Sequence, residues 1–176
     1  MIMQYSENTP KSEVFSEVRN FIEQEGFTIV DKDDARPWGG YFVIDEPQSL
    51  EFIDRFFPNL NPDEFTGFSK LSPKVLLVEP RKRLSWQYHY RRSEIWKVLS
   101  GKVGVIVSST NEETPIAELR KGDVIDLKRE QRHRLVGLDE WGIVAEIWKH
   151  TDPAHPSDED DIVRVGDDFG RSSSSE

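Results

Sequence analysis

The chain has 176 residues, of which 36% are hydrophobic and 32% are charged, a composition typical of a soluble globular protein. It contains no cysteine, which excludes disulfides, thiolate metal ligands and cysteine nucleophiles and is consistent with a cytoplasmic location. The net charge of −10 argues against general nucleic-acid binding. We therefore expect no nucleic-acid partner. No apolar run approaches the roughly 18 residues that cross a membrane, and no secretory signal is visible, so we expect no membrane partner.

The first part of the chain predicts helices. Residues 10–26 and, over a shorter stretch, residues 49–57 carry apolar side chains at helical spacing. Between them, Phe27–Val30 fits a short strand. Residues 58–73 contain three prolines and one glycine, which indicates a loop. We predict a helical N-terminal extension over residues 1–35.

From residue 74 onward, apolar and polar residues alternate with the period of a β-strand. Seven short segments show this pattern, namely 75–78, 84–90, 95–99, 103–107, 124–127, 134–138 and 143–148. Turn signals around Gly101 and Gly122 separate some of them. Many short strands with turns between them favour an antiparallel sandwich or barrel. We predict one mainly β domain over residues 36–171, followed by a disordered tail at residues 172–176.

Basic residues gather in two segments of this acidic chain. Residues 81–97 and 120–134 each carry six lysines or arginines, and together they hold only four acidic residues. A basic zone of this kind predicts a binding site for a small anion such as a phosphate ester. Two solvated loop faces would explain the same charges.

Four polar residues are spaced as ligands of one metal ion would be. Gln87 and His89 are two residues apart on a predicted strand and therefore share a face. Glu94 follows after a stretch that can turn, and His133 opens a later strand. Taken singly, each has a common structural explanation, such as a surface amide, a hydrogen-bonded histidine or a salt bridge. Together they predict one divalent ion, with zinc as the first choice and manganese, cobalt, iron or nickel as alternatives.

The spacing of these residues resembles the two motifs of the cupin superfamily. Gln87 stands where the first motif has a histidine, whereas His89, Glu94 and the later His133 fit. The second motif usually has proline, glycine and asparagine at the positions of Lys128, Glu130 and Gly137. The resemblance implies a jelly-roll barrel, also called a double-stranded β-helix.

A closer resemblance, to the type II mannose-6-phosphate isomerases, explains the glutamine, because these enzymes use Gln-x-His. The similarity is carried by RPWGGY (36–41), RLSWQYHYRRSEIW (83–96), LSG (99–101), HRL (133–135), EDDIVR (159–164) and DFGR (168–171). The guanylyltransferase half that is often fused to such domains is absent from this sequence. The resemblance implies a metal-dependent enzyme that interconverts mannose 6-phosphate and fructose 6-phosphate.

The same resemblance implies roles for several arginines. Arg92 stands at the position linked to isomerase activity, so we expect it to be catalytic. Arg36, Arg83 and Arg164 are candidates for binding the substrate phosphate, because a guanidinium matches phosphate geometry. Salt bridges within this acidic chain would also explain these three. The sequence alone does not identify the proton-transfer base.

Other functions fit the same pattern. One is an isomerase or epimerase of another phosphorylated or nucleotide-linked sugar, and another is a cupin module that binds a metal or a sugar without catalysis. A small iron oxygenase is a further alternative, which Gln87 disfavours. Tyr90 and Arg91 replace paired histidines of the family close to the expected site, so the sugar accepted can differ. A homodimer is a final expectation, because cupins often pair through their sheets.

Overall fold

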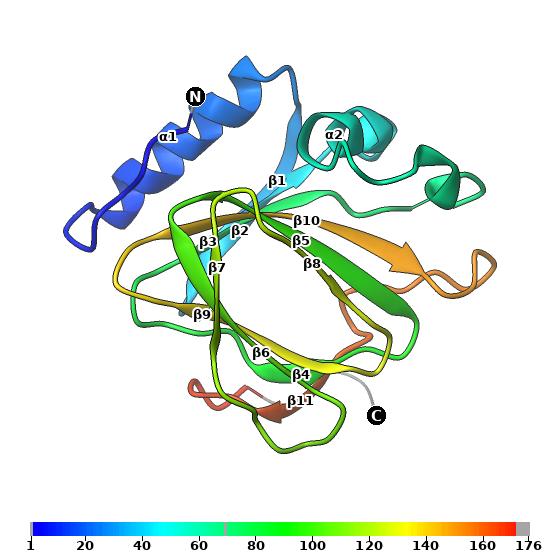
Figure 1. Cartoon of the computed structure of the whole chain (residues 1–176). Helices are drawn as coiled ribbons and strands as arrows, with labels where there is room; N and C mark the ends of the chain where they lie inside the picture. Colours follow the sequence, from blue (N-terminus) through cyan, green and yellow to red (C-terminus); the bar gives the residue numbers. More distant parts are fainter. Residues whose placement is uncertain (1, 69, 172–176) are drawn as a thin grey trace.

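Two antiparallel β-sheets face each other in the computed structural model, which describes residues 2–68 and 70–171 (Figure 1). The six-stranded sheet contains, in spatial order, β1 (Ile29–Arg36), β2 (Gly39–Ile44), β3 (Lys74–Val78), β10 (Gly142–His150), β5 (Arg92–Ser100) and β8 (Val124–Leu127). The five-stranded sheet contains β11 (Val163–Gly166), β4 (Trp86–Tyr88), β9 (Arg132–Gly137), β6 (Lys102–Ser108) and β7 (Ala117–Arg120). This architecture confirms the predicted mainly β barrel with an N-terminal helix.

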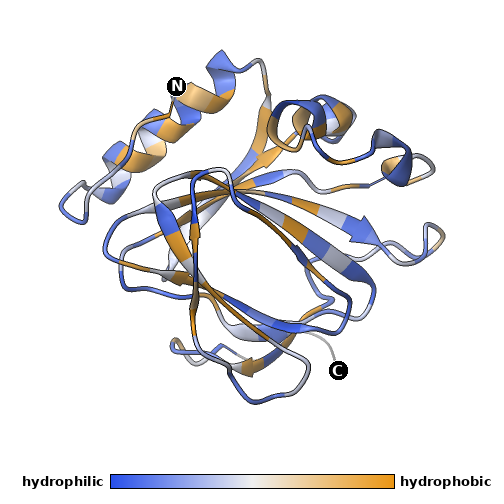
Figure 2. Cartoon of the chain, viewed as in Figure 1, coloured by the Kyte–Doolittle hydropathy of each residue, from blue (hydrophilic) through white to orange (hydrophobic). Residues whose placement is uncertain are grey.

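Helices cover the outer face of the six-stranded sheet. They are α1 (Lys11–Gln24) and α2 (Ser49–Phe56), with the short 3-10 turns η1 (Glu46–Gln48) and η2 (Pro62–Phe65) beside α2. Figure 1 shows both helices on one side of the barrel, with β11 on the opposite side. The apolar stripe of α1 packs in one large hydrophobic cluster with α2 and the outward side chains of the sheet. The alternation of hydrophobic and hydrophilic residues around α1 and along β5 and β10 is visible in Figure 2.

The space between the sheets holds a second apolar cluster. Its buried members are Leu76, Val78, Trp96, Val98, Val103, Val105, Leu127, Leu135 and Val144. They come from β3, β5, β6, β8, β9 and β10, so both sheets contribute. This cluster fills one part of the barrel interior, and polar residues fill the rest.

The sequence pattern misses or shortens three of the four strands that lie at sheet edges, whereas the fourth, β8, matches the predicted segment 124–127. β1 reaches to Arg36, well beyond the short strand expected at Phe27–Val30, and β7 and β11 are additional strands. Five of the eight residues of β1 are exposed, and most are polar. An edge strand forms through backbone hydrogen bonds to one neighbour and needs few buried side chains, so hydrophobic alternation gives little signal. β2, which pairs with β1, was not predicted either.

Two predicted glycine turns are confirmed. Gly101 connects β5 to β6 with φ 70°, and Gly122 connects β7 to β8 with φ 94°. A Cβ atom on Gly101 would lie 2.3 Å from the carbonyl oxygen of Trp141, so no other residue fits there. By contrast, Glu130 has φ 62° at the position where the second cupin motif has glycine, which places a side chain in a strained left-handed conformation.

The predicted division at residues 35 and 36 stays a prediction. The strand β1 runs across it and is hydrogen-bonded to β2. The predicted tail, residues 172–176, lies outside the described residues. Within residues 2–68 and 70–171, no helix is both long enough and apolar enough to span a bilayer.

Candidate metal centre

Three polar side chains from different strands meet inside the barrel. His89 directly follows β4, Glu94 lies in β5 and His133 lies in β9, and all three are buried. The Nε2 atom of His89 is 3.1 Å from Oε1 of Glu94, and the Nε2 atom of His133 is 3.5 Å from Oε2. Their ligand atoms all lie within 4.8 Å of one another. The structure thus brings together three of the four predicted ligands.

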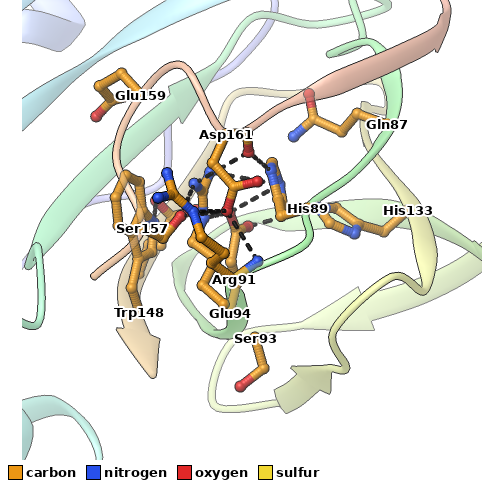
Figure 3. Close-up of polar contacts among 12 residues, drawn as sticks. Gln87, His89, Arg91, Ser93, Glu94, His133, Trp148, Ser157, Glu159 and Asp161 are labelled. Carbon is orange, nitrogen blue, oxygen red and sulfur yellow. Dashed lines mark hydrogen bonds and ion pairs between the residues drawn. The ribbon is translucent and has the colours of Figure 1, made fainter. Parts of the chain in front are cut away.

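Backbone carbonyls orient the two imidazole rings. The Nδ1 atom of His89 lies 2.6 Å from the carbonyl oxygen of Asp161, and that of His133 lies 3.0 Å from the carbonyl oxygen of Gln131. A carbonyl oxygen only accepts hydrogen bonds, so each Nδ1 carries the proton and each Nε2 presents a lone pair. Figure 3 shows the imidazole of His89 between Asp161 and His133. This outer hydrogen bond is the usual support of a metal-binding histidine.

The electrostatics of the cluster fit a cation. Burial lowers the pKa of His89, so the ring stays neutral. Burial opposes the charge of Glu94, but neighbouring His89 and Arg92 hold the pKa of this carboxyl well below its ordinary value, so it stays ionised. The buried Nε2 of His133 has no hydrogen-bond partner among the described residues. Two lone pairs and a carboxylate therefore converge, with Arg92 as a neighbouring donor at 2.9 Å from Oε1 of Glu94 and 3.4 Å from Nε2 of His89. A divalent ion suits the nitrogen and oxygen atoms of His89, Glu94 and His133.

The fourth predicted ligand, Gln87, lies beside this group. Its Cα pairs with that of His133 across β4 and β9. The Ser85 hydroxyl donates a hydrogen bond of 2.6 Å to the amide oxygen of Gln87, which holds the oxygen in a fixed orientation. In Figure 3, Gln87 and His133 lie on the side of His89 away from Asp161. Its role as a ligand stays a prediction.

Arg92 is buried at the start of β5, next to the cluster. Its Nε donates a hydrogen bond of 2.9 Å to Glu94, and one terminal nitrogen donates to the Ser157 hydroxyl at 2.8 Å. The guanidinium carbon lies 3.7 Å from the centre of the Trp148 ring. The ring and these hydrogen bonds fix the guanidinium, so Arg92 acts on Glu94 directly and positions its carboxylate.

A segment near the C-terminus completes the surroundings of His89, and the sequence reasoning assigned it no role. The side chain of Asp161 accepts hydrogen bonds of 3.0 Å from the backbone N–H groups of Tyr90 and Arg91. Its carbonyl accepts from His89, as described above. Asp161 belongs to the EDDIVR segment that carried the family resemblance, and that resemblance was the available signal.

A cavity of about 290 Å³ opens beside the cluster, and Gln87, Arg92 and Glu94 are in its wall. Arg36 and Arg164, two of the predicted phosphate ligands, also line it. Its remaining charged lining residues are Lys74, Glu146, Glu159, Asp160 and Arg171. The cavity therefore carries five cationic side chains close to the buried acceptors.

The structure separates Arg83 from the other predicted phosphate ligands. Arg83 is not among the residues that line the cavity. Its Nε and one terminal nitrogen donate to the carboxylate of Asp168 at 2.6 and 2.9 Å. Arg171, to which the sequence reasoning gave no role, lines the cavity and is held by a bidentate pair with Asp167 at 2.8 and 3.0 Å.

Glu146 is a second buried carboxyl in the cavity wall, and the sequence gave no signal for it. It lies on β10 between hydrophobic residues. The indole N–H of Trp96 donates to one of its oxygens at 2.7 Å, and that of Trp148 donates to the other at 3.0 Å. Burial, with the nearby charge of Glu94, raises the pKa of Glu146 to about 8.

One comparison with a solved structure supports the fold, and two others are weaker likenesses. KdgF from Halomonas sp. is similar with a TM-score of 0.50 at 15% identity, over 74% of this chain and 89% of that chain. A Cupin 2 conserved barrel domain protein from Salinispora arenicola has a TM-score of 0.41 at 22% identity, over 48% and 66% of the two chains. DMSP lyase DddQ from Ruegeria pomeroyi also has a TM-score of 0.41, at 16% identity over 52% of this chain. The chain covers only 44% of that lyase.

Sequence comparisons give the family. A search of curated proteins finds no match. The sequence model of the family described as "Mannose-6-phosphate isomerase C-terminal" matches residues 65–167, which include His89, Glu94, His133 and most of the cavity. This match spans more than half of the chain, and the two facing sheets have the cupin architecture. The chain therefore belongs to the mannose-6-phosphate isomerase C-terminal family, a family of cupin domains.

Proposed function

We propose that the protein is a metal-dependent isomerase of a sugar phosphate, with mannose 6-phosphate and fructose 6-phosphate as its substrate pair. The observation that carries the proposal is the buried group of His89, Glu94 and His133, because Glu94 also lies in the wall of a cavity that five cationic side chains line. The family match supports the choice of reaction. A cavity of about 290 Å³ is at the lower end of the range for small-molecule sites, which suits a substrate of this size.

His89, Glu94, His133 and Gln87 would hold one divalent ion, with zinc as the first choice. When bound, the ion would polarise the sugar oxygens and stabilise the negative charge of an enediolate. Arg92 keeps the Glu94 carboxylate ionised and in place. This contact gives Arg92 a positioning role beside the catalytic one expected from the resemblance.

The phosphate group is expected to bind at the basic part of the cavity. Arg36, Arg164 and Arg171 all line the cavity. A guanidinium offers two parallel N–H donors to a phosphate, which gives both charge and orientation. We therefore assign the phosphate to these three side chains and leave Arg83, which pairs with Asp168, outside the binding site.

The test is a coupled assay of mannose 6-phosphate conversion to fructose 6-phosphate. The purified protein is stripped of metal and reloaded separately with zinc, manganese, cobalt, nickel or iron. We expect turnover with at least one of these metals. If mannose 6-phosphate binds in calorimetry but no metal gives turnover, the protein is a binding module and the isomerase proposal is wrong.

A matched pair of histidine variants tests the metal centre. His133→Ala removes a proposed ligand, and we expect loss of both bound metal and turnover. His155→Ala is the control, because the His155 side chain is 76% exposed and pairs with Asp152 at the surface. Equal metal content in the two variants, measured by elemental analysis, would exclude the site at His133.

A further inference from the structure

We propose that Glu146 is the group that moves the proton between C1 and C2 of the substrate. The inference rests on the proposed isomerase function and adds to it the acid–base residue that the sequence left unidentified. It starts from the position of Glu146 in the wall of the cavity that Glu94 and Arg92 also line.

The register of the six-stranded sheet places Glu146 on its inner face. Glu146 of β10 pairs with Lys74 of β3 on one side and with Trp96 of β5 on the other. Trp148, two residues after Glu146 on β10, pairs with Glu94, which lies two residues before Trp96 on the antiparallel strand β5. Alternate residues of a strand share a face, so Glu146 and Glu94 project to the same side of the sheet. Glu146 is therefore built into the sheet beside the metal centre, on rigid strands.

Among the described residues that line the cavity, four carry carboxyl groups. Glu94 is the proposed metal ligand and pairs with Arg92. Glu159 is 65% exposed and forms an ion pair with Lys74, and Asp160 is exposed in the same loop. Only Glu146 among these four is buried and receives its hydrogen bonds from two neutral indole groups. A carboxyl that transfers a proton needs this combination of a fixed position and a weakly stabilised charge.

The surroundings of Glu146 suit reversible proton transfer near neutral pH. The charged groups that face it are Lys74 from β3 and Arg92 and Glu94 from β5. Burial is the largest influence, and with the negative charge of Glu94 it raises the pKa of Glu146 to about 8, although Lys74 and Arg92 act in the opposite direction. Each carboxyl oxygen accepts one indole N–H and keeps a second lone pair for a proton. Transfer by a group of this kind typically contributes about 10²–10⁴-fold to a rate.

The step balances without an oxidant or a reductant. In the aldose-to-ketose direction, the Glu146 carboxylate takes the proton from C2. The electron pair of the broken C2–H bond forms the C1=C2 bond, the π pair of C1=O1 moves to O1, and O1 takes a proton from water to give the enediol. Water then accepts the proton from O2, the freed pair re-forms a carbonyl at C2, and the C1=C2 pair takes the proton back from Glu146, which ends as a carboxylate again.

The test compares the zinc-loaded wild type with Glu146→Gln, using the active metal found in the assay above if zinc is not active. We expect the variant to lose at least about 100-fold in kcat. Bound metal and the calorimetric Kd for mannose 6-phosphate should change less than about threefold. Glu118→Gln is the control, because Glu118 lies on the exposed edge strand β7, and its kcat should equal that of the wild type.

A second variant keeps the carboxyl and covers the case in which Glu146→Gln does not fold. Trp96→Phe removes one N–H donor to the carboxylate, which disfavours its charged form. We therefore expect the acid limb of the kcat/KM profile against pH to move to higher pH. If the wild type is active and either variant has the wild-type kcat and pH profile, Glu146 is not the proton carrier and the isomerase proposal stands. Absence of turnover in the wild type overturns both the isomerase proposal and the proposed role of Glu146.

Discussion

The two faces of strand β10 are both buried but differ in chemistry. The face toward the helices carries Ile143, Ala145 and Ile147, which belong to one apolar cluster. The face toward the barrel interior carries Glu146 and Trp148 in the wall of the cavity. The apolar outer face stabilises the fold by burial. Burying a polar group costs free energy that ion pairs or hydrogen bonds must offset, so the polar residues of the inner face are better explained by a role in chemistry.

Strand β5 repeats the difference. Ile95 and Leu99 face the helices in the apolar cluster, whereas Glu94 and Trp96 face the interior. β5 and β10 are adjacent and antiparallel, with Trp148 opposite Glu94. On both strands the buried carboxyl groups thus lie on the inner side, beside apolar residues of the interior cluster, whereas the side toward the helices is apolar at its buried positions. A substitution should therefore have different consequences on the two sides.

The largest effect is expected from Glu94→Gln on the inner face. The amide keeps the side-chain volume and can donate to the lone pair on Nε2 of His133, so the fold should survive. The anionic ligand is lost, and we expect metal affinity to fall by at least about 100-fold. In the wild type, a metal at 100 times its Kd should add about 2.7 kcal/mol to the free energy of unfolding. Urea titrations with and without metal should show this gain in the wild type and no gain in the variant.

On the outer face, Ile147→Ala should lower stability and leave the metal centre intact. Ile147 is fully buried in the apolar cluster beneath the helices. Removal of its side chain should lower the free energy of unfolding by about 3 kcal/mol. Metal content per folded molecule, measured after purification at low temperature, should equal that of the wild type. Loss of metal at unchanged stability would contradict the division between the two faces.

The pH dependence of stability separates Glu146 from the other buried groups. Because the pKa of Glu146 is raised to about 8, the folded apoprotein holds a proton that the unfolded chain has released above about pH 4.5. This contribution to stability is complete below that pH and is lost as the pH rises toward 8. The lowered pKa values of His89 and His150, caused mainly by burial, act in the opposite direction below about pH 6.5.

The difference between the wild type and Glu146→Gln isolates the carboxyl, since both proteins contain the same histidines. Relative to the wild type, the variant should gain roughly 3 to 4 kcal/mol in free energy of unfolding between pH 5 and pH 8. Urea denaturation of both apoproteins at several pH values measures this gain. A constant difference across the range would show that the carboxyl does not titrate there.

The smallest effect is expected at the turn before β9. Glu130 has φ 62°, and its backbone N–H donates a hydrogen bond of 2.8 Å to the carbonyl of His89. Glycine adopts this conformation without strain, so Glu130→Gly should raise the free energy of unfolding by about 0.5–1 kcal/mol. Thermal unfolding of the apoprotein checks this. A lower melting temperature would mean that the Glu130 side chain contributes more than the strain costs.

Local periodicity predicted much of the fold and the centre of the site. Helix α1 and the central strands follow from apolar residues at periods of 3.6 and 2, because each buries one face or both. Gln87 and His89 share a face for the same reason, and the motif spacing identified Glu94 and His133 as their companions. The edge strands β7 and β11 and most of β1 escaped prediction, because their sequences show little hydrophobic alternation. The edge strand β8 was predicted at Val124–Leu127.

The rest of the site depends on contacts between residues far apart in the chain. Glu146 reads in the sequence as a charged interruption of an apolar strand, and only the pairing of β10 with β5 gives it Trp96 as a partner. The sequence indicated Arg83 as a phosphate ligand and gave Arg171 no role, but Arg83 pairs with Asp168 outside the cavity and Arg171 lines it. Periodicity determines which way a side chain faces along its own strand, whereas the partner of a buried charge is determined by which strands are neighbours.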